Sequence, residues 1–197
     1  MDFGEFIGGL STFDLLVVLY FFAFFVLGYI QGTIRRLLGI ASILFSFLLA
    51  ANLRDPLGQF LAANWRQFPP EYSYMIGFGT VFVAAAIAFT VVIQGFYKTQ
   101  PLFEKSRFAD EVLGGLLGLL QAALILAAVV VILDPFFRIP GIPESAGELP
   151  VLREFWQALD GSRTAVVFRE TIVPFLFTLV GLFIPGSLKV FFPGTPG

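Results

Sequence analysis

Four long stretches of the chain carry no charged side chain, and this feature constrains the fold more than any other. The stretches are residues 15–34, 37–53, 72–97 and 112–133. An α-helix rises about 1.5 Å per residue, so about 20 apolar residues match the roughly 30 Å hydrocarbon core of a bilayer. A helix of a soluble protein would place charged residues on its outer face within a turn or two. The pattern therefore predicts a polytopic membrane protein.

The expected fold class is all-α, with four transmembrane helices. They are predicted at about residues 13–33, 35–53, 72–97 and 111–133, within a membrane domain that covers residues 1–135. The composition agrees, because apolar residues make up 57% of the chain and charged residues only 13%, whereas about a quarter of the residues in a soluble domain are charged. The length of 197 residues leaves no room for a large soluble domain.

The remaining residues, 136–197, are expected to form a linker rich in proline and glycine, followed by interfacial or re-entrant helices. Residues 151–160 are predicted to form one short helix. Residues 171–188 are again uncharged, but Pro174 and Pro185 interrupt the run. We expect this segment to lie on the membrane or to dip into it, with a fifth transmembrane span as the alternative.

Another interfacial element is predicted in the loop after the second span, over residues 56–66. Asp55 followed by Pro56 is typical of an N-cap with proline at the first helical position. The apolar residues that follow fall on one face of such a helix: Leu57, Phe60, Leu61 and Trp65. We expect a short amphipathic helix in the membrane interface, with a plain loop as the alternative.

The absence of two residue types excludes several classes of enzyme and cofactor. With no cysteine, the chain has no disulfide, thiolate nucleophile, Cys-ligated zinc or iron–sulfur cluster. With no histidine, it has no His-based catalytic triad and no His-ligated metal. No run of Asp and Glu suggests a carboxylate metal site. We therefore expect no enzymatic activity, cofactor or metal, and the net charge of −2 gives no reason to expect nucleic acid as a partner.

Small residues recur at four-residue spacing on three of the predicted spans, which is typical of close packing between helices. The stripes are Ser42, Ser46 and Ala50 on the second span, Thr80, Ala84 and Ala88 on the third, and Gly114, Gly118 and Ala122 on the fourth. Gln121 lies near the middle of the fourth span, where its amide needs a partner on another helix. We expect Gln121 to hold helices together, with a role in a solute path as the alternative.

The charges in the loops predict an orientation. The loops after the first and third spans carry Arg35, Arg36, Lys98, Lys105 and Arg107, whereas the loop after the second span carries Arg54 and Arg66. Positive residues beside short loops face the cytoplasm, so both termini are predicted outside. The N-terminal segment is acidic where a cleavable signal peptide would be basic, so the first apolar run is expected to be a retained span.

Two motifs stand at the ends of the predicted spans. In the first, Asp14 enters the first span and is followed by Gly28-Tyr29 and Gly32-Thr33-Ile34-Arg35; in the second, Asp110, Leu113, Gly114 and Gly118 open the fourth span. Over about residues 13–135, the chain resembles the CvpA family of bacterial membrane proteins, which are named for colicin V production. This resemblance implies four helices in the inner (cytoplasmic) membrane.

The chain departs from the pattern of that family at two positions. The family usually has an acidic residue after the arginine of the first motif, where this chain has Arg36. It often has a basic residue one turn past the second glycine of the second motif, where this chain has Gln121. Any ionic network between spans is therefore expected to differ in this chain.

The resemblance implies a role in the production or export of colicin V-type toxins, or in cell-envelope homeostasis. We expect a non-enzymatic protein that acts through the lipid bilayer and through contacts with envelope or export proteins or with further copies of itself. The alternative is a small oligomeric transporter or channel subunit, for which Thr90, Gln94 and Gln121 are the polar candidates. An intramembrane protease is disfavoured, because the chain has neither a Ser–His pair nor a Gly-x-Gly-Asp motif.

The charged residues of the two motifs give one specific expectation. Asp14 is predicted at the outer end of the first span, so about 30 Å of hydrocarbon separates it from Arg35 and Asp110 at the inner ends of the second and fourth spans. We therefore expect Arg35 and Asp110 to form an ion pair that joins the hairpin of the first two spans to the fourth span.

Overall fold

The computed structural model describes residues 11–66, 68–96, 106–138 and 149–189. The predicted end of the third span at Tyr97 and the basic residues Lys98 and Lys105 lie outside the described residues. Within the described ranges every regular element is a helix, which confirms the all-α fold class.

Four long helices correspond to the four predicted spans. They are α2 (Thr12–Gln31), α3 (Thr33–Asn64), α4 (Pro70–Phe96) and α5 (Arg107–Phe137). Shorter elements follow: α6 (Pro150–Asp160), α7 (Arg163–Val167), the π-helix η1 (Phe168–Ile172), α8 (Val173–Val180), the 3-10 helix η2 (Gly181–Phe183) and α9 (Gly186–Lys189).

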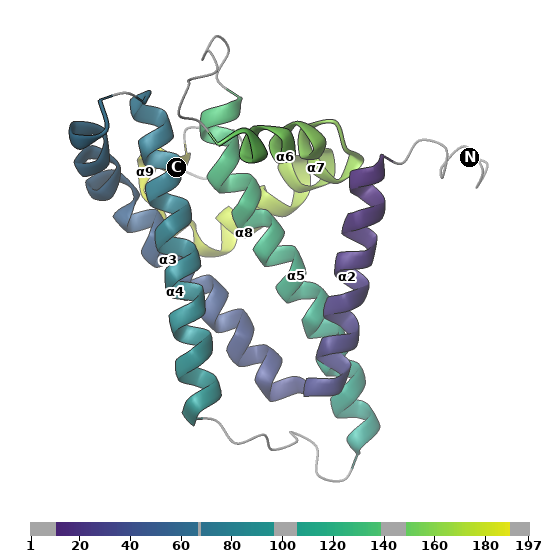
Figure 1. Ribbon diagram of the computed structural model, residues 1–197. Coiled ribbons are helices and arrows are strands. Elements are labelled where there is room, and N and C mark those ends of the chain that lie inside the picture. The colour runs from purple at the N-terminus through teal and green to yellow at the C-terminus, as the bar shows by residue number, and fades with distance from the viewer. Residues whose placement is uncertain (1–10, 67, 97–105, 139–148, 190–197) are drawn as a thin grey trace.

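Successive long helices run in opposite directions (Figure 1). We name the end at which α2 begins, α3 ends, α4 begins and α5 ends the Asp14 end, and the opposite end, where Gly32 joins α2 to α3, the Gly32 end. Helix α2 packs along α5, and α3 packs along α4, whereas α2 and α3 diverge from Gly32 and make few contacts. The first two spans are therefore joined by a tight turn but do not pack as the expected hairpin, because Gly28 of α2 faces Gly114 of α5.

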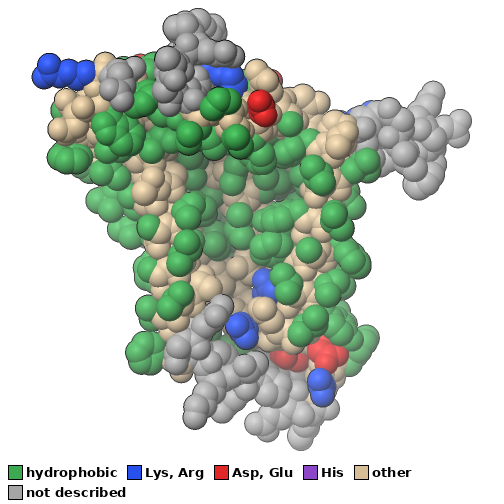
Figure 2. All heavy atoms as spheres, in the orientation of Figure 1, with side chains coloured by type: hydrophobic (Ala, Val, Ile, Leu, Met, Phe, Trp, Pro, Cys, Tyr) green, Lys and Arg blue, Asp and Glu red, His purple; other side chains and the backbone are tan. Residues whose placement is uncertain are grey.

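The long helices have the surface of a membrane protein. Apolar side chains cover the visible face between the two ends, and charged side chains gather mainly toward the ends (Figure 2). Five helical segments of the described chain are long and apolar enough to cross a bilayer: the four long helices and residues 163–183. The chain is thus an all-α polytopic membrane protein, as predicted, and its fifth apolar segment consists of four short elements rather than one regular helix.

Helix α3 extends beyond the predicted second span. Residues 56–64 are helical, but Asp55 does not begin a new helix, because Pro56 lies inside the continuous α3. The residues directly after Pro56 pack against α4: a Cβ placed on Gly58 would overlap the ring of Tyr74, and one on Gly77 would lie 3.3 Å from Leu57 Cγ. This packing holds the last turns of α3 on α4, where the sequence indicated a helix lying separately in the membrane interface.

The apolar core lies in the half of the bundle nearer the Asp14 end. Phe47 of α3 faces Phe78 of α4 with ring centroids 5.8 Å apart, and Val130 of α5 is fully buried beside them. The short helices after residue 149 join the same core through Leu159 and Val173, which are also fully buried. The C-terminal elements therefore pack on the end of α5 (Figure 1) and bring polar side chains to that end of the bundle.

Candidate functional site

Glycines of the two motifs meet where α2 crosses α5. A Cβ placed on Gly28 would overlap the main-chain oxygen of Gly114, and one on Gly114 would overlap the main-chain oxygen of Gly28. A Cβ on Gly118 would likewise overlap the main-chain oxygen of Phe24. The two backbones approach as closely as they do because these positions have no side chain. Nearer the Asp14 end, Tyr20 donates a hydrogen bond of 3.1 Å to the main-chain oxygen of Ala122. This bond also holds α2 against α5.

Asp110 of the second motif lies at the turn between α2 and α3. Gly32 adopts a φ of 77°, in the region that favours glycine, and a Cβ there would overlap the Asp110 carboxylate. Oδ1 of Asp110 accepts a hydrogen bond from the main-chain nitrogen of Thr33 at 3.4 Å, and the Thr33 hydroxyl donates to the main-chain oxygen of Asp110 at 3.0 Å. Asp110 thus caps the N-terminus of α3 from another helix, where the preceding residue Gly32 has no side chain to do so.

The expected ion pair between Arg35 and Asp110 is not found among the described residues. Asp110 is buried and faces Thr33, whereas the half-buried Arg35 lies two positions further along α3. Residues two apart on a helix point in different directions, so a carboxylate that caps Thr33 does not also meet Arg35. The sequence placed the two residues at the same end of the bundle but could not give the rotation of α3.

The neighbouring arginine, Arg36, makes the charged contact of this region. Its side chain is 5% exposed, and Nη1 donates a hydrogen bond of 2.8 Å to Oε1 of Gln121 on α5. The guanidinium also lies 5.7 Å from the centroid of the Phe24 ring. Gly39 leaves room for the amide, because a Cβ there would lie 2.8 Å from Nε2 of Gln121. Gln121 therefore has its partner on another helix, and that partner is a buried cation whose Nε bonds to no other group.

Asp14, at the opposite end, connects α2 to the C-terminal segment. It completes a capping box with Ser11, and its Oδ1 also accepts hydrogen bonds from the main-chain nitrogen of Thr164 at 2.9 Å and from the Thr164 hydroxyl at 2.7 Å. The carboxylate is 4% exposed. Asp14 thus caps its own helix and at the same time holds the start of α7 in place, a long-range contact that could not be located from the sequence.

A second buried carboxylate at the Asp14 end was missed by the sequence analysis. Asp134, 2% exposed, accepts hydrogen bonds from Nε and Nη2 of Arg169 at 2.7 Å and from Nε1 of Trp156 at 3.0 Å. Arg169 also binds Asp160. The available signal was an aspartate at the end of one apolar run and an arginine, Arg169, just before the next uncharged run at residues 171–188. Asp134 follows directly on the predicted fourth span, but its partner could not be predicted, because the register between two distant segments cannot be deduced from one sequence.

Of the remaining polar candidates for a solute path, the structure describes the side chain of Thr90 only. Thr90 is exposed on the outer face of α4, and the side chain of Gln94 lies outside the described residues. Between the two ends, the buried hydroxyls of Ser42 and Ser46 bond to carbonyls one turn earlier in α3. Within the described ranges, no three Asp or Glu side chains come together as a metal site would require. The buried charged groups of the described chain, Asp14, Arg36, Asp110 and Asp134, thus lie in two layers, one toward each end, that hold helices together.

The two polar layers and the glycine contact between α2 and α5 join segments that lie far apart in the sequence. A family model described as Colicin V production protein matches residues 13–173. The chain belongs to this family. The match extends from the α2 residue next to Asp14 to the first residue of α8, so it includes both polar layers and the helices that carry them. A search of curated proteins and a search of solved structures each returned no match.

Proposed function

We propose that this member of the Colicin V production protein family is a non-enzymatic inner-membrane protein that supports toxin production or export, or envelope homeostasis, by binding other membrane proteins. The family match supports the general role. The single observation that favours action through a partner is a small-residue stripe that the bundle does not use.

That stripe lies on α4. Thr80, Ala84 and Ala88 are all exposed, whereas Gly114 and Gly118 are buried against α2. Small residues at four-residue spacing allow a second helix to approach closely within a membrane. The exposed face of α4 therefore has the form of a contact surface for a transmembrane helix of another protein.

The buried carboxylates support a role without chemistry. Asp14 holds α7, Asp110 caps α3, and Asp134 binds Arg169. Each of these groups is buried and is engaged in a contact between elements, so it is poorly placed to act as a general acid or base on a substrate.

A second candidate function, a small oligomeric channel or transporter subunit, is favoured by one observation. Arg36 is buried inside the helix bundle, and its Nε has no hydrogen-bond partner. A charged residue in such a position often marks the path of an ion or solute. In this reading several copies would assemble so that their Arg36 side chains face a shared path.

Site-specific photocrosslinking in native membranes, followed by mass spectrometry, distinguishes the two functions. With the crosslinker at position 84, we expect adducts with another membrane protein. Val83, the exposed residue beside the stripe, is the matched control position and should give markedly fewer adducts. Adducts only between copies of this chain would favour the channel subunit, and equal yields at positions 83 and 84 would contradict a specific contact through the stripe.

A further inference from the structure

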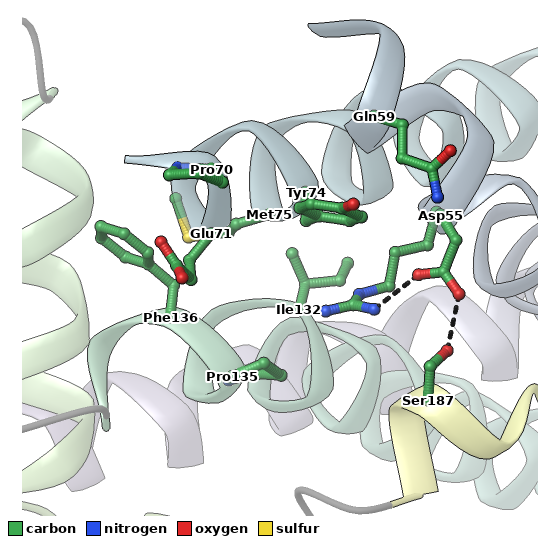
Figure 3. Close-up of a pocket in the computed structure, with 11 residues that line it drawn as sticks. Asp55, Gln59, Pro70, Glu71, Tyr74, Met75, Ile132, Pro135, Phe136 and Ser187 are labelled. Atoms are coloured by element: carbon green, nitrogen blue, oxygen red, sulfur yellow. Dashed lines mark hydrogen bonds and ion pairs between the residues drawn. The ribbon is translucent and has the colours of Figure 1, made fainter. Parts of the chain in front are cut away.

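A cavity of about 400 Å³ opens at the Asp14 end of the bundle (Figure 3). Its walls come from the end of α3, the start of α4, the end of α5 and α9. The charged residues of the lining are Arg54, Asp55 and Glu71, and its apolar wall includes Met75, Ile132 and Phe136. The volume is within the range of sites for small ligands, which is about 300–1,000 Å³.

Two of the three charged residues neutralise each other. Nη1 of Arg54 lies 2.8 Å from Oδ1 of Asp55, and the guanidinium lies 5.2 Å from the centroid of the Tyr74 ring. The hydroxyl of Ser187 donates a hydrogen bond of 2.7 Å to the other oxygen of Asp55 (Figure 3). The pair is thus fixed by its neighbours and contributes little net charge to the cavity.

The carboxylate of Glu71 is the charge that remains. It lies beside Phe136 and Met75 (Figure 3), and among the described residues it has no hydrogen-bond or ion-pair partner. An uncompensated carboxylate attracts a cation, and one next to an apolar wall suits a cation attached to a carbon skeleton. A primary ammonium fits best, since its three N–H groups can donate to the carboxylate.

The level of the cavity in the membrane indicates where such a ligand comes from. Residues with both an aromatic ring and a polar tip gather at this end of the bundle: Trp65, Tyr72, Tyr74 and Trp156. Tyrosine and tryptophan are enriched at the level of the lipid head groups. The cavity therefore opens where lipid head groups lie.

We propose that this cavity binds the head group of an ammonium-bearing membrane lipid. The ammonium binds Glu71, and the carbons of the glycerol and upper acyl chains contact Met75, Ile132 and Phe136. Phosphatidylethanolamine carries the required primary ammonium. Phosphatidylcholine has a quaternary ammonium without N–H donors, and phosphatidylglycerol has no positive charge.

Native mass spectrometry of the full chain in detergent tests this proposal. The three lipids, with identical acyl chains, are added separately, and the lipid-bound fraction is measured. We expect phosphatidylethanolamine to bind about fivefold more than phosphatidylcholine, which is what one partly exposed ion pair can contribute. Phosphatidylglycerol should bind least. Equal binding of all three lipids would overturn the proposal.

Glu71→Gln gives the decisive comparison. This substitution keeps the side-chain volume and removes the charge, so the preference for phosphatidylethanolamine over phosphatidylcholine should disappear. Glu154→Gln is the matched control, because Glu154 is exposed on α6 and does not line the cavity; it should keep the preference of the parent. Because Glu71 has no partner among the described residues, both variants should melt like the parent. A preference that persists in Glu71→Gln would contradict the assignment.

Free phosphoethanolamine tests whether the ligand is a lipid or a soluble amine. The melting temperature of the chain is measured with each compound at the same concentration. We expect phosphatidylethanolamine to raise this temperature. The soluble head group should leave it unchanged, because it lacks the chains that contact the apolar wall. Equal stabilisation by the two compounds would assign the cavity to a soluble amine and overturn the lipid as its ligand.

Discussion

Arg36 of α3 and Gln121 of α5 are hydrogen-bonded to each other at 2.8 Å. A buried cation of one helix thus bonds to a neutral amide of the other. These are the two positions at which the sequence led us to expect a difference from related chains. An acid at position 36 and a base at position 121 would form an ion pair at the same place.

This contact predicts the outcome of exchanging the charges. Gln121→Lys alone brings an ammonium against the guanidinium of Arg36 and should lower stability, and Arg36→Glu alone loses the arginine contacts. The double variant Arg36→Glu/Gln121→Lys should form an ion pair and be more stable than the sum of the two single effects by about 0.5–3 kcal/mol. Thermal unfolding in detergent measures the difference.

Arg35 supplies the control for that experiment. It neighbours Arg36 in the chain but makes no contact with Gln121. The pair Arg35→Glu/Gln121→Lys should therefore show additive effects. Coupling as strong as that of the Arg36 pair would mean that long-range charge, and not the hydrogen-bonded contact, determines the result.

The crossing of α2 and α5 predicts a steep cost for any side chain at Gly118. Gly118→Ala should lower stability by about 1–3 kcal/mol, and Gly118→Leu by more, because the added atoms overlap the main-chain oxygen of Phe24. Gly186→Ala is the matched control, since a Cβ there meets nothing within 4 Å; it should change stability by less than about 0.5 kcal/mol. Equal effects of the two alanine substitutions would show that α2 and α5 are not in close contact.

The long helices could be predicted well from the sequence, because a single energy determines where they lie: the cost of placing a charged side chain in hydrocarbon. A charge within residues 72–97 or 112–133 would be costly in hydrocarbon, so the absence of charge marks each span directly. The helix ends were less predictable. Pro56 indicated a helix start, yet α3 runs through it, because packing of Gly58 on Tyr74 outweighs the local preference of proline.

The contacts between helices were largely beyond the sequence. The four-residue spacing of Gly114 and Gly118 indicates a close-packing face, but nothing in the spacing says that its partner is α2 rather than α3. The Asp134–Arg169 contact joins residues 35 apart in sequence, and its formation depends on how α7 and η1 fold back onto α5. Such pairings are set by the three-dimensional packing of all segments together.

Breaking the Asp134–Arg169 pair by changing one residue should lower the stability of the bundle much more than removing both residues together. Asp134→Asn should destabilise by about 3 kcal/mol, because it leaves Arg169 with only the more exposed carboxylate of Asp160 as its ionic partner. Replacing both residues, as in Asp134→Leu/Arg169→Met, should cost less than the sum of the single changes. The exposed pair Arg107–Glu111 is the comparison, and its loss should cost less than about 1 kcal/mol. Equal costs for the two pairs would mean that Asp134 is solvated.

The orientation of the bundle remains a prediction from the loop charges. A reporter fused at residue 103 should read as cytoplasmic, and a reporter at residue 64 as external, because the loops at the Gly32 end carry more positive residues. The reverse pattern would invert the assignment of both ends.

The apolar segment 163–183 is expected to enter and leave the membrane at the same end. Its first residues bond to Asp14 through Thr164, and the chain that follows it bonds to Asp55 through Ser187, so both of its flanks lie at the Asp14 end. The chain has no cysteine, which permits single-cysteine labelling with a membrane-impermeant maleimide. Arg163→Cys and Gly186→Cys should both be labelled from the same side of the membrane, and Arg107→Cys, at the Gly32 end, from the other. If Gly186→Cys is labelled together with Arg107→Cys instead, the segment crosses the bilayer as a fifth span.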